Sequence, residues 1–71
     1  MSELSALRKA VKVAGGQTAL ARAVDAKQVN IWSWLNRSKR TPPEYVIPVE
    51  KATGVPRYEL RPDIYPLDEV T

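Results

Sequence analysis

The chain opens with apolar residues at helical spacing. These residues are three or four positions apart and fall on one helix face: Leu4, Leu7, Val11 and Ala14. They predict a helix over about residues 3–14, with Ser2 as its N-cap. Gly15 and Gly16 follow, and they can adopt the positive φ with which many helices end.

Two shorter helices are predicted next, separated by three residues. The first, at about residues 17–24, places Leu20, Ala21 and Val24 on one face. The pattern stops at residues 25–27, without proline or glycine, and restarts in a new phase over residues 28–36. The apolar face of this third helix is formed by Ile31, Trp34 and Leu35. Helices this short need tertiary packing for stability, so the two are expected to pack together.

A basic loop at residues 37–40 leads to a fourth predicted helix. Thr41-Pro42-Pro43-Glu44 has the form of a capping box with proline at the first helical position, and Gly54 is expected to end the helix after Thr53. Pro48 lies inside this helix and has no N–H to donate, so a kink is expected there.

One further helical turn is predicted at residues 57–60, between two prolines. The predicted fold is all-α, a compact helix-turn-helix domain of four to five short helices spanning residues 1–66, with a flexible tail at residues 67–71. Ala21 lies in the middle of the second helix, where a larger side chain would push the third helix away. This small residue supports the helix-turn-helix arrangement.

Composition narrows the function. At 71 residues the chain has room for one domain and none for a separate catalytic domain. It has neither cysteine nor histidine, and its carboxylates are scattered over predicted surface positions. We therefore expect no enzyme, no metal, no cofactor and no small-molecule substrate.

The chain also has no apolar run near the ~20 residues that span a bilayer, and no signal peptide. These features predict a protein without a membrane partner. We expect it in the cytoplasm of a bacterial host cell, associated with the nucleoid.

Charge is unevenly divided along the chain. Residues 1–40 hold eight basic and two acidic groups, whereas residues 41–71 hold three basic and six acidic groups. A basic first half suggests a face that binds a polyanion, although a solvated helix surface can show the same imbalance.

Several segments resemble a known family. Gln17-Thr18-Ala19-Leu20-Ala21 and Val29-Asn30-Ile31-Trp32-Ser33-Trp34-Leu35-Asn36 are similar to the lambda-repressor-like helix-turn-helix of phage Cro repressors and their YdaS-like bacterial relatives. The resemblance continues through Arg40-Thr41-Pro42-Pro43-Glu44-Tyr45, Glu50-Lys51-Ala52-Thr53-Gly54 and Glu59-Leu60-Arg61-Pro62, and covers roughly residues 14–66. Asp25 stands where the family's turn usually has glycine, and aspartate tolerates left-handed φ better than most residues.

The resemblance implies a transcriptional repressor that binds a pseudo-palindromic double-stranded DNA operator as a homodimer, with residues 28–36 in the major groove. Residues near the N-terminus of such a helix reach base edges. The candidate base-reading residues are Gln28, Val29, Trp32 and Ser33. Gln28 can pair with adenine, Val29 can pack on a thymine methyl group, and Ser33 can bond to several edges.

Other polar residues are candidates for contacts to the DNA backbone, which fix the register of the protein on the duplex. They are Gln17, Thr18, Lys27, Asn30, Asn36, Arg37, Lys39 and Arg40. The alternative interpretation of the basic loop at residues 37–40 is a solvated segment with no binding role. Lys9, Lys12 and Arg22 stay undecided between solvation and phosphate contact.

Two candidates have specific alternatives. Gln28 could instead satisfy local backbone groups at the start of its helix, and Trp32 could pack against the basic loop. An alternative function is an antitoxin-like regulator of YdaS type that binds a protein partner through the acidic second half of the chain.

Overall fold

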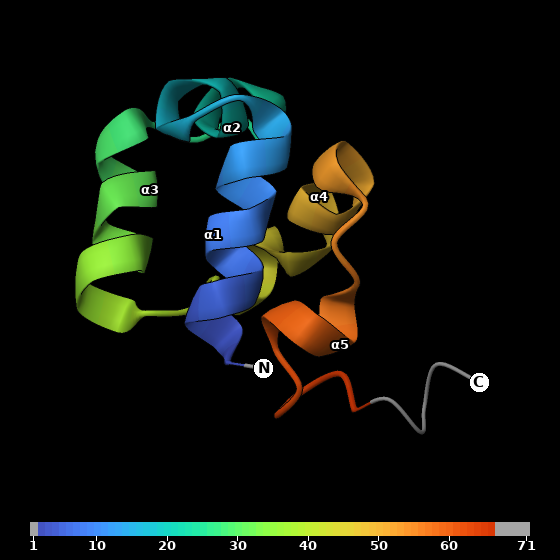
Figure 1. The fold of residues 1–71 in the computed structure, drawn as a ribbon. Coiled ribbons are helices and arrows are strands. Elements are labelled where there is room, and N and C mark those ends of the chain that lie inside the picture. Colours follow the sequence, from blue (N-terminus) through green and yellow to red (C-terminus); the bar gives the residue numbers. More distant parts are fainter. Residues whose placement is uncertain (1, 67–71) are drawn as a thin grey trace.

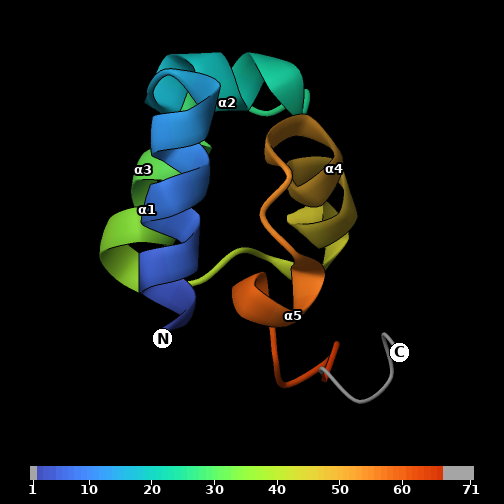
Figure 2. The same cartoon turned by 45° about the vertical axis from the view of Figure 1, so that its right-hand side comes forward.

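The computed structural model describes residues 2–66, so the predicted tail at residues 67–71 lies outside the described part. Its helices are α1 (Glu3–Ala14), α2 (Gln17–Ala23), α3 (Gln28–Ser33), the π-helical turn η1 (Trp34–Ser38), α4 (Pro43–Thr53) and α5 (Arg57–Leu60). Residues 2–66 contain no strand, and the predicted all-α fold is confirmed. Figures 1 and 2 show α2 lying across the upper end of the molecule, and α4 and α5 on the far side of α1 from α3.

Helix α1 begins and ends as the sequence predicted. The Ser2 hydroxyl accepts a hydrogen bond from the Ser5 N–H at 3.0 Å. Gly15 has φ 102°, its N–H donates to the Lys12 carbonyl, and the Gly16 N–H donates to the Val11 carbonyl at 2.9 Å. This pair of bonds is a Schellman motif, which satisfies carbonyl groups that the end of the helix leaves open.

The buried face of α1 is turned relative to the predicted one. Ala6, Leu7 and Ala10 are buried, whereas Leu4, Val11 and Ala14 are only partly buried. Val11 and Ala14 nevertheless pack against the core, so the predicted face borders the buried one. Ala6 and Ala10 belong to the core, and α1 packs against α2, α4 and α5.

The pairing of α2 with α3 follows the prediction closely. Ala21 is 3% exposed, and Leu20, Val24 and Ile31 are buried with it in one core. The connecting turn places Asp25 at φ 59°, the left-handed conformation expected there. The Ala26 N–H then donates to the Ala21 carbonyl at 2.8 Å, which brings the chain back across α2.

The third helix does not continue as an α-helix to Asn36. It changes to the π-helical turn η1 at Trp34, and Lys39 follows in the left-handed conformation at φ 58°. The Asn36 amide donates to the Trp32 carbonyl at 2.9 Å, in the region where the helical spacing changes. Short π-helical turns are found mostly inside α-helices and often at functional sites.

The capping box predicted at the start of α4 is wrong, whereas the proline at the first helical position and Gly54 at the end of the helix are confirmed. Pro42 is the N-cap and no side chain caps the helix. Thr41 is fully buried, and its hydroxyl oxygen has no hydrogen-bond partner within the described chain. Pro42 and Pro43 lack N–H groups, so a side-chain cap has fewer donors to accept from at this end. The helix runs through Pro48 to Thr53, and the kink stays a prediction.

Arg61 joins three distant segments. Its side chain is 10% exposed, and it donates to the Thr41 carbonyl at 3.0 Å and to both carboxylate oxygens of Asp63. Arg40 donates to Glu3 at 3.1 Å and lies 3.6 Å from Asp63. These four residues, Glu3, Arg40, Arg61 and Asp63, form the Arg61 network. It ties the start of α1 and the segment before α4 to the chain after α5.

Candidate nucleic-acid interface

The two faces of α3 have opposite character. Ile31 of α3 and Trp34 of the following turn η1 are buried, and the Trp34 ring packs on Tyr45 of α4 at 4.9 Å between centroids. On the other face Gln28 is exposed, Val29 is 60% exposed and Trp32 is 45% exposed. Ser33, Asn30 and Leu35 have intermediate exposure. The core therefore holds the helix by one side and leaves its candidate base-reading side open.

A hydrogen bond joins the starts of α2 and α3. The Gln28 Nε2 donates to the Gln17 Oε1 at 2.6 Å, across eleven residues of sequence. Both glutamines were candidate site residues, but the sequence did not show that they touch. The bond occupies one donor of Gln28 and leaves its Oε1 and second N–H available. The Gln28 side chain thus bonds to another side chain, and no bond to local backbone groups is found.

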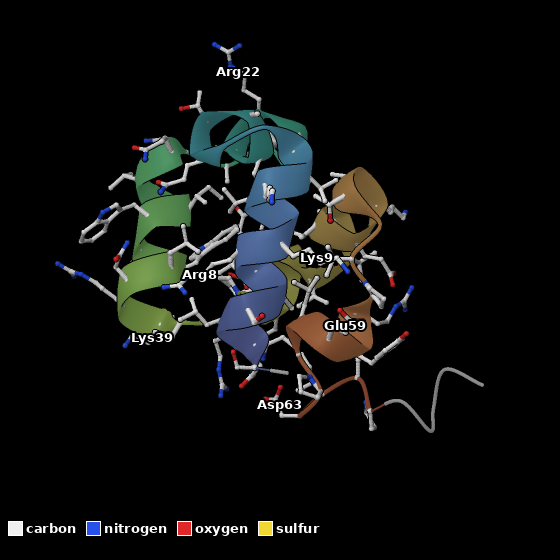
Figure 3. All side chains as sticks on the ribbon, in the orientation of Figure 1. Arg8, Lys9, Arg22, Lys39, Glu59 and Asp63 are labelled. Carbon is white, nitrogen blue, oxygen red and sulfur yellow. The ribbon has the colours of Figure 1, made fainter. Side chains whose placement is uncertain are left out.

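The cations around α3 and η1 differ in their surroundings. Lys27, Arg37 and Lys39 are exposed and form no ion pair with any group in residues 2–66. Figure 3 shows Lys39 just after η1, at the end of the α3 segment away from α2. Arg40 is 43% exposed in its side chain and is engaged by Glu3 and Asp63. The predicted basic loop therefore contains two open cations and one that belongs to the Arg61 network.

The other candidate backbone contacts lie at the two ends of the helix-turn-helix. Thr18 is exposed and Gln17 is partly exposed at the start of α2. Asn36 is exposed, but its amide is engaged by the Trp32 carbonyl. Trp32 is 45% exposed, an exposure that fits partial packing against the basic loop as well as contact with DNA.

Further basic residues are exposed away from α3. Arg8, Lys9 and Lys12 lie on α1, and Arg22 on α2. In Figure 3 the Arg22 side chain extends outward from α2. These four residues form no ion pair within residues 2–66.

Two ion-paired carboxylates have displaced pKa values. The hydrogen bonds from Arg61 lower the pKa of Asp63 to about 2, and the pKa of Arg61 is raised by the same bonds. The hydrogen bond from the Arg57 side chain lowers the pKa of Glu50, which lies 2.8 Å from Arg57. The pair of Glu50 and Arg57 links α4 to α5, and both pairs lie outside the exposed face of α3.

An open apolar groove of about 440 Å³ lies between α2 and α4. It is lined by Ala23, Ile47, Pro48, Lys51 and Ala52. Sequence reasoning missed it, because the hollow depends on how Ala23 of one helix faces the other helix. Across residues 2–66, no cluster of three or more carboxylate, cysteine or histidine side chains is placed to hold a metal ion. The helices of this part of the chain also include none with the length and hydropathy of a membrane span.

Comparisons with known proteins agree with this fold. The model of a family described as bacterial toxin YdaS matches residues 7–69. A solved structure, that of the Cro protein from the putative prophage element Xfaso 1 in Xylella fastidiosa strain Ann-1, is similar with a TM-score of 0.77 and 34% sequence identity. The match covers 83% of this chain and 92% of that one. No curated protein matches the sequence.

Proposed function

Because this chain belongs to the Cro/YdaS-like helix-turn-helix family, we propose that it is a sequence-specific DNA-binding repressor. In this proposal α3 enters the major groove of an operator in phage or prophage DNA. The observation that carries it is the exposed polar end of α3, where Gln28 is held by Gln17 at 2.6 Å while the opposite face is anchored in the core. An α-helix fits the major groove and reads bases from its first residues.

Gln28 is proposed to read adenine. A bidentate pair needs an oxygen that accepts from the adenine N6 amino group and an N–H that donates to N7. Gln28 keeps both groups after donating its other N–H to Gln17. The bond to Gln17 fixes the amide in advance, so less side-chain freedom is lost on binding. Ser33 lies on the last turn of α3 and is proposed to bond to a neighbouring edge.

Phosphate contacts are proposed for the polar groups on either side of α3. They come from Gln17, Thr18, Lys27, Asn30, Asn36, Arg37 and Lys39, with Arg40 as an eighth. The open cations Lys27, Arg37 and Lys39 give up no ion pair within the described residues when they approach a phosphate. Arg40 gives up its bond to Glu3, so its net contribution is expected to be smaller.

The operator is proposed to be pseudo-palindromic and bound by a homodimer. One domain of this size makes few base contacts, and a two-fold dimer reads two half-sites about 34 Å apart. Sedimentation at several protein concentrations, with and without duplex, tests whether the dimer forms alone or on DNA. A single protomer on a saturated operator contradicts the dimer.

Counterion release offers a direct test of the binding itself. Fluorescence anisotropy with a labelled duplex is expected to show affinity falling linearly with salt on a double-logarithmic plot, with a slope of about −0.9 for each phosphate contacted. Binding that is insensitive to salt contradicts the proposal.

Base reading is tested by selecting bound sites from a random duplex pool, first with the natural chain and then with Gln28→Ala. The variant is expected to lose preference at one base pair of each half-site while it keeps the others. Gln17→Ala serves as a matched variant, because it removes the partner of Gln28 and leaves the reading amide present. It is expected to weaken binding while the preferred base stays the same. An unchanged preference in Gln28→Ala contradicts the assigned role.

The family whose model matches is described as bacterial toxin YdaS. We propose, as a second candidate function, a regulatory protein that acts through a protein partner. That description names a toxin, whereas the alternative drawn from the sequence was antitoxin-like. Co-purification of a stoichiometric protein partner, together with no enrichment of any duplex sequence, favours this candidate over the first. The two functions can also coexist in one chain.

A further inference from the structure

Two large apolar side chains lie on the face of α3 that is proposed to enter the major groove. Val29 is 60% exposed and Trp32 is 45% exposed. They are three residues apart in one helix, so they are neighbours on its surface. Gln28 lies on the same exposed face and is four residues from Trp32. The apolar pair is therefore continuous with the proposed base-reading residue.

The segment around this pair suits nucleic acid. No aspartate or glutamate occurs between Asp25 and Glu44, whereas four cations do. Ile31 is fully buried and Trp34 packs on Tyr45 at 4.9 Å, so the helix that carries the pair is fixed to the domain from behind. Val29 and Trp32 are thus presented on a rigid support beside open positive charges.

The chemistry of the groove selects one target for apolar side chains. Most groups that base pairs present in the major groove are hydrogen-bond donors and acceptors, from which a valine gains nothing. The apolar one is the C5-methyl group of thymine. Resting on the proposed DNA-binding function, we infer that Val29 and Trp32 read pyrimidine C5-methyl groups, and that each half-site carries thymine beside the base read by Gln28.

The spacing of the pair limits which methyl groups are read. Residues three apart on a helix have Cβ atoms about 5–6 Å apart. Successive base pairs are about 3.4 Å apart along each strand. Val29 and Trp32 therefore span one to two base-pair steps, and the methyl groups they contact lie on adjacent or next-adjacent pairs.

Deoxyuridine tests this inference, because it removes only the methyl group and keeps the pairing edge of thymine. Each thymine of the selected duplex is replaced in turn by deoxyuridine, and affinity is measured at fixed salt. Burying one methyl group corresponds to about a fourfold change in affinity. We expect about a fourfold loss at one or two positions of each half-site and no change elsewhere. Placing 5-methylcytosine at such a position is expected to bind more tightly than placing cytosine there.

Side-chain variants assign the effect to the two residues. Val29→Ala is expected to abolish the difference between thymine and deoxyuridine at one position, and Trp32→Ala at another. Val13→Ala is the matched control, because Val13 is a valine on α1 with a similar exposure of 56%. It is expected to keep the full difference at every position. None of the three residues is buried, and circular dichroism checks that each variant is folded.

The outcomes separate this inference from the function on which it rests. A selected sequence that is bound equally well with deoxyuridine at every position overturns methyl reading and leaves DNA recognition standing. A thymine preference that survives in both Val29→Ala and Trp32→Ala also overturns it. If selection enriches no sequence, the proposed function fails first. Equal binding of random pools made with thymine and with deoxyuridine then overturns methyl reading as well.

Discussion

The basic residues on the two sides of this molecule are used differently. After α5, Arg61 is almost buried and donates to the Thr41 carbonyl and the Asp63 carboxylate. Beside α3, Arg37 and Lys39 are exposed and have no ion pair within residues 2–66. The comparison shows that a positive charge count alone does not locate a polyanion surface. What distinguishes Arg61 from Arg37 and Lys39 is that a carboxylate already neutralises Arg61.

The largest expected effect is a loss of stability when Arg61, the ion-paired cation after α5, is replaced. Arg61→Ala leaves the buried Thr41 carbonyl and the neighbouring carboxylates without their donor, which is expected to cost about 2–3 kcal/mol of unfolding free energy. In a domain of this size that lowers the melting temperature by roughly 10–20 °C. Thermal unfolding followed by circular dichroism measures it.

Arg37→Ala is the control, since an exposed cation without a partner is expected to change stability by less than about 0.5 kcal/mol. Equal melting temperatures for Arg61→Ala and Arg37→Ala would remove the distinction between the two sides.

The next largest effect is on DNA binding and concerns the unpaired cations beside α3. Arg37→Ala and Lys39→Ala are each expected to weaken binding to all sequences alike and to reduce the salt slope by about 1. Lys51→Ala is a suitable control, because Lys51 is an exposed cation on α4 that lines the groove between α2 and α4. If Lys51→Ala changes the slope as much as Arg37→Ala does, the proposed surface is misplaced.

Arg40 lies between the two sides and is expected to show a smaller effect of each kind. Its ion pair with Glu3 is partly exposed, so Arg40→Ala is expected to cost at most about 1 kcal/mol of stability. Its change in salt slope is expected to be less than that of Arg37→Ala. Both variants are measured by thermal unfolding and by salt titration of DNA binding. If Arg40→Ala reduces the salt slope by about 1, as expected for Arg37→Ala, Arg40 contacts a phosphate despite its ion pairs.

The smallest expected effect is on the stability of the fold at acid pH. The pKa of Asp63 is lowered to about 2 in the folded chain from an ordinary value of 3.8, so its contribution to stability is present above pH 3.8 and is lost as the pH falls towards 2. Asp63→Asn is expected to flatten the fall of melting temperature over this window. Glu50, whose pKa is also lowered, keeps part of the fall in the variant. Parallel curves for the two chains would show that the Asp63 pair is not coupled to folding.

The helix boundaries were largely predictable because they depend on local chemistry. Ser2, Gly15 and Gly54 act within a few residues of their own positions, and each ends or begins a helix as expected. Thr41 and Glu44 failed as a capping box, because Thr41 is buried and Pro42 rather than Thr41 is the N-cap. The change from α3 to η1 at Trp34 was likewise invisible in the spacing of apolar residues.

The site was predictable as a set of residues but not as a set of contacts. The phase of Ile31 and Trp34 determines which side of α3 is buried, so the exposure of Gln28, Val29 and Trp32 follows from sequence. The bond between Gln17 and Gln28 depends on the crossing of two helices. The ion pairs of Arg40 with Glu3 and Asp63 join residues far apart in the chain, so the local sequence pattern does not predict them.

The most direct test of the central claim is to map the bound surface by NMR, using amide chemical shifts during titration with a selected duplex. The claim predicts that the largest changes fall at residues 16–18 and 27–39, and include the side-chain amides of Gln17 and Gln28. Small changes are predicted along α5 and around the groove between α2 and α4. Changes concentrated at Ile47, Lys51 and their neighbours, with α3 unaffected, would contradict it.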